Sequence, residues 1–204
     1  MASDFSYIFE DVGGVLEAFE SMKLPAWDAL PDLPLYMDQV MVLMDRFLRV
    51  DVPGAPEQDD KDSRILTSSM VNNYVKMGIM PAPEKKKYGR THLAYLLMIC
   101  ILKQSFSIPV LGMFINTNVE EMGIEAFYNL FVESYEEYYG MYIRSLINVY
   151  DDIFHKKGAE ADRVRNEAVM SIAAVACADA GKLTCDTADI VISQAEEARK
   201  KEKK

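Results

Sequence analysis

Residues 66–102 hold contrasting segments in an order that restricts the fold more than any other part of this 204-residue chain. A short amphipathic segment from about residue 67 predicts a helix, which Gly78 and the prolines after it should end. A run of three lysines follows, and then an almost entirely apolar segment at 91–102. The order predicts two helices separated by a basic loop, with the second helix at the centre of the fold.

Most of the remaining chain is also predicted to be helical. Residues 38–48 carry apolar side chains at helical spacing, Ser107 with Pro109 starts another short helix, and Asn118 with Glu121 resembles a capping box. Further helices are predicted at about 118–138, 141–156, 159–180 and 186–201, with Gly140, Gly158 and Gly181 at the breaks. A possible small wing at 80–89 is the main strand signal. The fold class is therefore predicted to be mainly α.

Composition favours a cytoplasmic protein that does not enter a membrane. The longest apolar run, at 93–102, is about half of the ~20 residues needed to cross a bilayer. The N-terminus lacks the basic segment and apolar core of a signal peptide. Three cysteines without a CxxC pair fit reduced thiols better than a disulfide framework.

The charge is distributed unevenly along the chain. The net charge is −10, which argues at first against nucleic acid. Residues 61–104, however, hold eight basic and two acidic residues, so this segment alone offers phosphate a favourable field.

The basic segment contains candidate DNA contacts at helical spacing and in the following loop. Ser69, Asn72, Asn73 and Lys76 fall at i, i+3, i+4 and i+7, and so form one polar stripe. Asparagine can pair with an adenine edge, and lysine can reach guanine or phosphate. The loop adds Lys85, Lys86, Lys87, Tyr88 and Arg90. The simpler interpretation is an ordinary amphipathic surface helix followed by a solvated turn.

The same residues resemble the MerR-type winged-helix family. Tyr74, Gly78, Ile79, Met80 and Pro81 are similar to the end of the family's second helix and its turn. Lys86 and Tyr88 occupy wing positions, Leu93, Leu96, Ile99 and Leu102 match the next helix, and Phe106, Ser107, Ile108 and Leu111 are similar to the entry into the one after it. The chain departs from the family in having 50–63 between its first two helices and Asn72 at the place of a usual arginine. As a whole it also resembles an uncharacterised bacterial domain family.

The MerR-type resemblance implies a domain organisation and a function. It implies an N-terminal extension at 1–35, a MerR-like winged helix-turn-helix at 36–113, and a C-terminal helical bundle at 114–204. The expected function is transcription regulation through duplex DNA, as a homodimer, with the C-terminal helices dimerising or binding a protein partner. The alternative keeps the fold without DNA binding, as a helical protein–protein interaction or assembly module.

Catalysis is the class that the sequence favours least. The chain has no P-loop, no GxGxxG, no HExxH and no Ser-His-Asp order, so no catalytic residue, cofactor or metal is expected. Tyrosines and phenylalanines crowd residues 127–154 and could line a ligand pocket, although packing of a helical bundle is the more common role.

Overall fold

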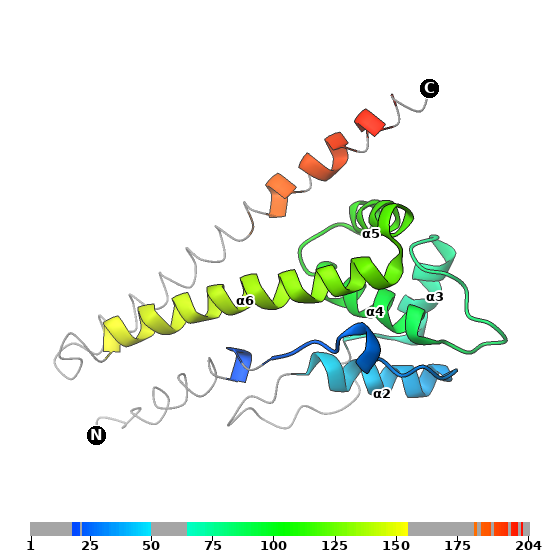
Figure 1. Cartoon of the computed structure of the whole chain (residues 1–204), viewed down its shortest axis with the longest axis horizontal. Helices are drawn as coiled ribbons and strands as arrows, with labels where there is room; N and C mark the ends of the chain where they lie inside the picture. The colour runs from blue at the N-terminus through cyan, green and yellow to red at the C-terminus, as the bar shows by residue number, and fades with distance from the viewer. Residues whose placement is uncertain are drawn as a thin grey trace, which may run out of the picture. The chain divides into compact units, whose positions relative to one another are not determined.

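The structure is a computed structural model that describes residues 18–20, 22–49, 65–154, 182, 185–188, 190–195, 197–199 and 201. These residues belong to two compact units. The first contains the described residues of 24–133 and those after 181, and the second contains 18–20, 22, 23 and 134–154. The described residues are mainly helical, as the sequence predicts (Figure 1). None of their helices is long and apolar enough to cross a membrane.

The first unit begins with a short 3-10 helix, η1 (Trp27–Ala29), and α2 (Met37–Leu48). The Gln39 side chain starts α2, because its Oε1 accepts a hydrogen bond of 2.8 Å from the Tyr36 N–H. Val40 and Met44, one turn apart, are buried. The predicted helix at 38–48 is therefore confirmed.

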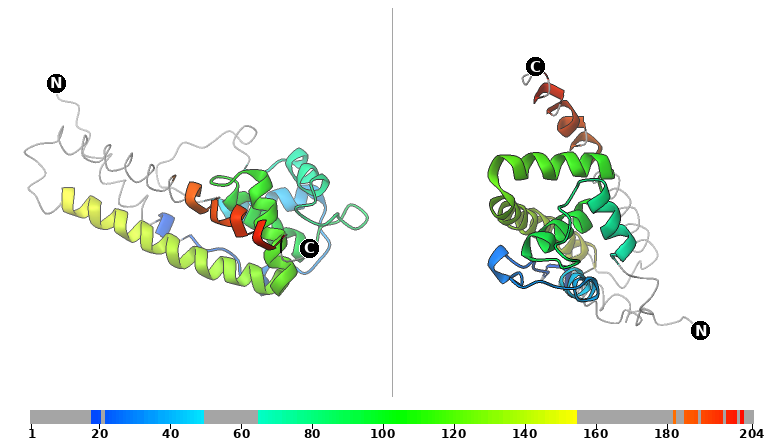
Figure 2. Two further views of the ribbon diagram at one scale, coloured as in Figure 1. Left: turned by 90° about the horizontal axis from the view of Figure 1, so that it is seen from above. Right: turned by 90° about the vertical axis from the view of Figure 1, so that its right-hand side faces the viewer.

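Two further helices of this unit follow the predicted order. Thr67 caps α3 (Ser68–Lys76), since its side-chain oxygen accepts from the Met70 N–H at 3.3 Å. All eight residues of α4 (Arg90–Leu102) from Leu93 to Cys100 are buried. Figures 1 and 2 show α4 between α2 and α5, with α3 at one side. The prediction that the apolar helix forms the centre of the fold is confirmed.

The boundary between α5 (Ile108–Met122) and α6 (Ile124–Phe154) corrects the sequence analysis. Asn118 does not cap a helix. It lies inside α5, where its side chain donates to the Phe114 carbonyl at 2.7 Å. The chain breaks at Gly123, whose φ of +83° suits glycine. One helix therefore runs through the predicted start at residue 118.

Gly140 does not interrupt α6, although the sequence analysis placed a break there. A single glycine inside a helix costs only about 1 kcal/mol, and side chains before and after Gly140 make contacts of their own. Tyr135 and Tyr139 stack with ring centroids 5.3 Å apart, and Arg144 pairs with Glu20 at 3.3 Å. The separate helices predicted at 118–138 and 141–156 are parts of one.

The remaining expectations concern the wing and the C-terminal helices. The described residues contain no strand at 80–89, where isolated bridges join Glu84 to Lys87 and Leu35 to Tyr88. The small wing predicted at 80–89 is therefore not present as strands, and residues 84–87 form a turn. Described residues between 182 and 201 are helical, as predicted for 186–201. The predicted helix at 159–180 and the break at Gly158 lie outside the described residues.

Cys100 is expected to resist alkylation in the folded protein. Burial raises the pKa of its thiol to about 11, although nearby Lys103 acts in the opposite direction. At about pH 8 the thiol is therefore neutral and shielded, whereas Cys185 is half-buried. Iodoacetamide labelling followed by mass spectrometry should modify Cys185 before Cys100, and should modify both of these residues after unfolding. Rapid labelling of native Cys100 would contradict this.

The same burial of Cys100 predicts a pH dependence of stability. Because the thiol ionises at lower pH in the unfolded chain, the free energy of unfolding should fall as the pH rises from 9 towards 11.

Candidate nucleic-acid interface

Helix α3 separates its buried and polar residues cleanly. Val71 and Tyr74 are buried on the inner side. Ser69, Asn72, Asn73 and Lys76 are all exposed. The sequence-predicted stripe therefore forms one solvent-facing surface. The Asn73 side chain makes a weak contact of 3.4 Å with the Met77 sulfur, one turn away.

The C-terminal end of α3 is fixed by backbone geometry and by α5. Gly78 has a φ of +70°, which supports the paired hydrogen bonds that end a helix: Gly78 N–H to Val75 O and Ile79 N–H to Tyr74 O, both at 3.0 Å. The Asn116 side chain of α5 donates to the Gly78 carbonyl at 3.0 Å. The direction of α3 relative to α5 is therefore well defined.

The segment 80–89, here called the lysine loop, contains a tight turn with unusual residues. The Lys87 N–H donates to Glu84 O at 2.9 Å, and the two residues between them, Lys85 and Lys86, have φ values of +48° and +64°. Positive φ at both central positions describes a type I′ turn, which favours Asn-Gly. Side-chain-bearing residues in this region cost roughly 1–2 kcal/mol each. The strain falls on the residues that carry the charge.

Replacing the strained lysines with turn-forming residues should stabilise the protein. We expect Lys85→Asn with Lys86→Gly to raise the free energy of unfolding by about 1 kcal/mol, because both residues accept a positive φ. Urea unfolding measures the change. The matched control is Lys85→Gln with Lys86→Gln, which removes the same two charges and keeps the strain. Equal stability of the two variants would contradict the assignment of strain to this turn.

Tyr88 and Arg90 are held by the protein itself. Tyr88 is buried, and its backbone pairs with that of Leu35 in both directions at 2.8 Å. The Arg90 Nε donates to Leu30 O at 3.1 Å, and its two terminal nitrogens lie 3.7 Å from Asp28 and 3.8 Å from Asp32. Both residues therefore anchor the lysine loop to the segment before α2, which limits what they offer to a phosphate.

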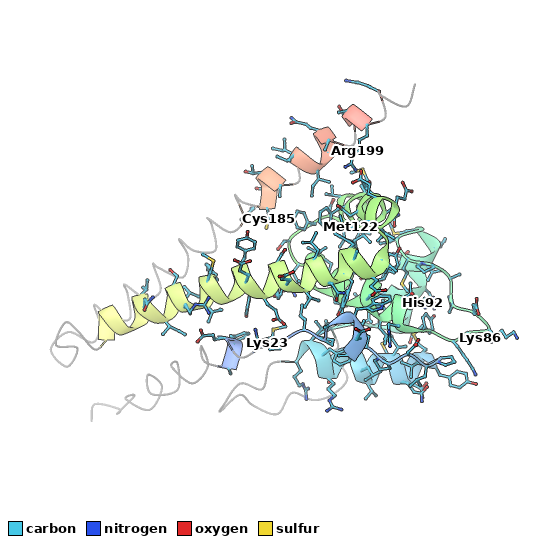
Figure 3. All side chains as sticks on the ribbon, viewed as in Figure 1. Lys23, Lys86, His92, Met122, Cys185 and Arg199 are labelled. Carbon is cyan, nitrogen blue, oxygen red and sulfur yellow. The ribbon has the colours of Figure 1, made fainter. Side chains whose placement is uncertain are left out.

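The three lysines of the loop differ in their surroundings. Lys85 and Lys86 are exposed, and Figure 3 shows Lys86 at the outer end of the loop. The Lys87 ammonium lies 5.3 Å from the ring centroid of Tyr36. Lys86 also lines a groove of about 980 Å³ together with Ser68, the first residue of α3. The lysine loop and the first residue of α3 therefore line one groove.

The wall of this groove is formed mainly by α2. It contains apolar side chains, among them Met41 and the exposed Val42, and also the acidic residues Asp38 and Asp45. Arg49 lies 3.8 Å from Asp45 and offsets part of the negative charge. An anion would therefore be favoured near Lys86, and not beside the acidic residues of α2.

The local charge of the described segment remains strongly basic. Residues 65–104 contain six basic residues, against Glu84 as the one acid. No group of three or more metal-ligating side chains occurs among the residues that the structure describes. The arrangement places several cations and exposed amides on one surface.

His92, in the first turn of α4, is a residue beside this surface that the sequence analysis did not name. Both of its ring nitrogens contact the backbone of the lysine loop, at Gly89 N and Ala82 O. The sequence signal was its position three residues after Gly89, the place at which a side chain can reach back to the helix start.

These features define a mainly α-helical domain with a basic helix-and-loop surface. The family model described as Domain of unknown function (DUF1836) matches residues 25–142, more than half of the chain. The chain belongs to this family, which confirms the resemblance to an uncharacterised domain family. A search of curated proteins and a search of solved structures each returned no match.

Proposed function

We propose that this protein binds duplex DNA as a transcriptional regulator of the winged-helix class. The observation that carries the proposal is the exposed polar stripe of α3, because it is followed by a loop with exposed lysines that lines the same groove as the first residue of the helix. In helix-turn-helix proteins the recognition helix contacts base edges, while neighbouring segments hold the phosphates. Helix α3 and the lysine loop have the composition that this division of roles requires.

The exposed stripe of α3 is suited to the major groove. The helix has nine residues and is about 14 Å long, and no acid lies on it to repel phosphate. Asn72 and Asn73 can each make paired hydrogen bonds to adenine, and Lys76 can reach guanine or a phosphate. Ser69 adds a small hydroxyl near the start of the helix. Sequence preference should therefore include adenine.

The lysine loop would supply phosphate contacts beside α3. Lys85 and Lys86 are exposed at the tip, and Lys87 follows beside Tyr36. The order of α2, α3, loop and α4 agrees with the MerR-like arrangement expected from the sequence, with the wing shortened to a turn. Tyr88 and Arg90 support the loop in this proposal. A homodimer would present two α3 helices to two half-sites, which adds affinity that one small module lacks.

Substitution of Asn72 tests readout by α3. A duplex would first be selected from random DNA with the wild-type protein. We expect Asn72→Ala to bind that duplex about 10- to 100-fold more weakly, because one paired contact to adenine contributes about 1–3 kcal/mol of discrimination. Binding to random DNA should be unchanged, as measured by fluorescence anisotropy. Failure to enrich any sequence would argue against recognition by this helix.

The second candidate function is a helical protein–protein interaction or assembly module. The observation that favours it is a set of exposed apolar side chains on α6. Tyr138 is 66% exposed and Met141 is 55% exposed, and Tyr142 and Val149 are also exposed. Spacings of three, four and eleven residues place these side chains on one face of the helix. If this were the whole function, removing the loop lysines would leave partner binding unchanged.

A further inference from the structure

The His92 imidazole joins the two ends of the lysine loop. Its Nδ1 accepts a hydrogen bond of 3.0 Å from the Gly89 N–H, and its Nε2 lies 3.3 Å from the carbonyl oxygen of Ala82. The His92 N–H in turn donates to Gly89 O at 3.0 Å. Tyr88 packs edge-on against the ring, with centroids 5.4 Å apart. Figure 3 shows His92 nearer the helices than Lys86.

These partners determine the protonation state of the ring. An N–H can only donate, so Nδ1 must carry a lone pair towards Gly89. A carbonyl oxygen can only accept, so Nε2 must carry the proton towards Ala82. The neutral imidazole with hydrogen on Nε2 is therefore the form that satisfies both contacts, and the imidazolium would lose the contact to Gly89.

The contacts of His92 complete the support of the loop. Ala82 and Gly89 stand on either side of the three lysines, and the turn between them is closed by the bond from Lys87 N–H to Glu84 O. We propose that His92 is the positioning residue of the lysine loop: in its neutral form it holds the loop base and so sets where Lys85–Lys87 meet phosphate. The effect of His92 on phosphate contact rests on the proposed DNA binding. Its effect on the position of the loop does not.

The surroundings of His92 in the first turn of α4 are mainly positive. Arg90 on the same turn and Lys85–Lys87 in the loop are positive, and Glu84 is the negative residue of that loop. Burial raises the pKa of Tyr88, so the phenol against the ring stays neutral. Because an imidazolium cannot accept the hydrogen bond from the Gly89 N–H, acidification should release the loop base.

The direction in which DNA affinity changes with pH distinguishes a positioning role of His92 from a purely electrostatic role. A protonated His92 would attract phosphate, so a purely electrostatic role would strengthen DNA binding on acidification. A positioning role predicts the opposite, because the loop loses its arrangement as the positive charge appears.

The first experiment examines the loop without DNA. Nitrogen-15 NMR of the full chain should show neutral His92 with the proton on Nε2, and the Gly89 amide should shift as His92 titrates. In His92→Gln, which keeps an acceptor at this helix position, that step should disappear. His155→Gln, which removes the second of the two histidines, should retain it. A proton on Nδ1, or an unchanged pH step in His92→Gln, would overturn the inference.

The second experiment measures affinity for random-sequence duplex DNA at low salt. We expect His92→Ala to bind about three- to tenfold more weakly than wild type at neutral pH, as two hydrogen bonds of ~1 kcal/mol permit. His92→Gln should lose less, and the ratio of wild-type to His92→Gln affinity should fall on acidification. A rising ratio would overturn the positioning role. If wild type binds no DNA, the proposed function fails, while the NMR result still decides the inference.

Discussion

Replacing Lys85, Lys86 and Lys87 together with glutamine is expected to weaken binding to random-sequence duplex DNA by about 10²- to 10³-fold near 0.1 M salt. Each phosphate contact that is lost lowers the salt slope by about 0.9, and three contacts together give this loss. Fluorescence anisotropy across a salt series measures both quantities. The glutamine side chains keep most of the length of lysine, so the loss would report charge and not packing.

The matched control changes the same charge elsewhere. Lys200, Lys201 and Lys203 of the C-terminal sequence, replaced with glutamine, also lower the net charge by three. We expect this variant to lose much less affinity, because these residues lie outside the lysine loop. Equal losses in the two variants would mean that any DNA binding depends on total charge, and would argue against the lysine loop as a defined phosphate contact.

Leu96→Ala is expected to lower the free energy of unfolding by about 2–5 kcal/mol. Leu96 is fully buried in α4, and truncation of such a side chain removes apolar contacts and leaves a cavity. Urea unfolding followed by circular dichroism measures the change. The matched control is Leu33→Ala, since Leu33 is 52% exposed and should cost about 0.5 kcal/mol or less. Similar costs for the two would contradict the central position of α4.

The sequence predicted those elements whose signals are local. The stop at Gly78 and the apolar segment that becomes α4 both depend on residues close together in the sequence, and the structure contains both. The polar stripe of α3 followed from the same periodicity. Its exposure could be predicted because Val71 and Tyr74 occupy the opposite face.

The sequence-based prediction was wrong where one residue pattern is compatible with two backbone structures. Asn118 with Glu121 reads as a helix start, but Gly123 can adopt the positive φ at which α5 ends. Gly140 reads as a break, but tertiary and side-chain contacts along α6 outweigh the small intrinsic cost of glycine in a helix.

Other features of the site depend on contacts across the chain, which sequence periodicity does not contain. Arg90 reaches Leu30 O, sixty positions earlier, so its engagement by the protein could not be predicted from the loop. The strain at Lys85 and Lys86 arises from the turn that Glu84 and Lys87 close. The double contact of His92 likewise required the three-dimensional path of residues 82–89.

The most direct test of the account is the affinity of the full-length wild-type protein for random-sequence duplex DNA, measured by anisotropy across a salt series. The proposed function predicts binding at low salt that weakens steeply as salt rises, with a slope that three or more phosphate contacts would give. Absence of binding at the lowest salt would contradict the proposed function, and would favour the protein–protein interaction module, with the exposed face of α6 as its candidate surface.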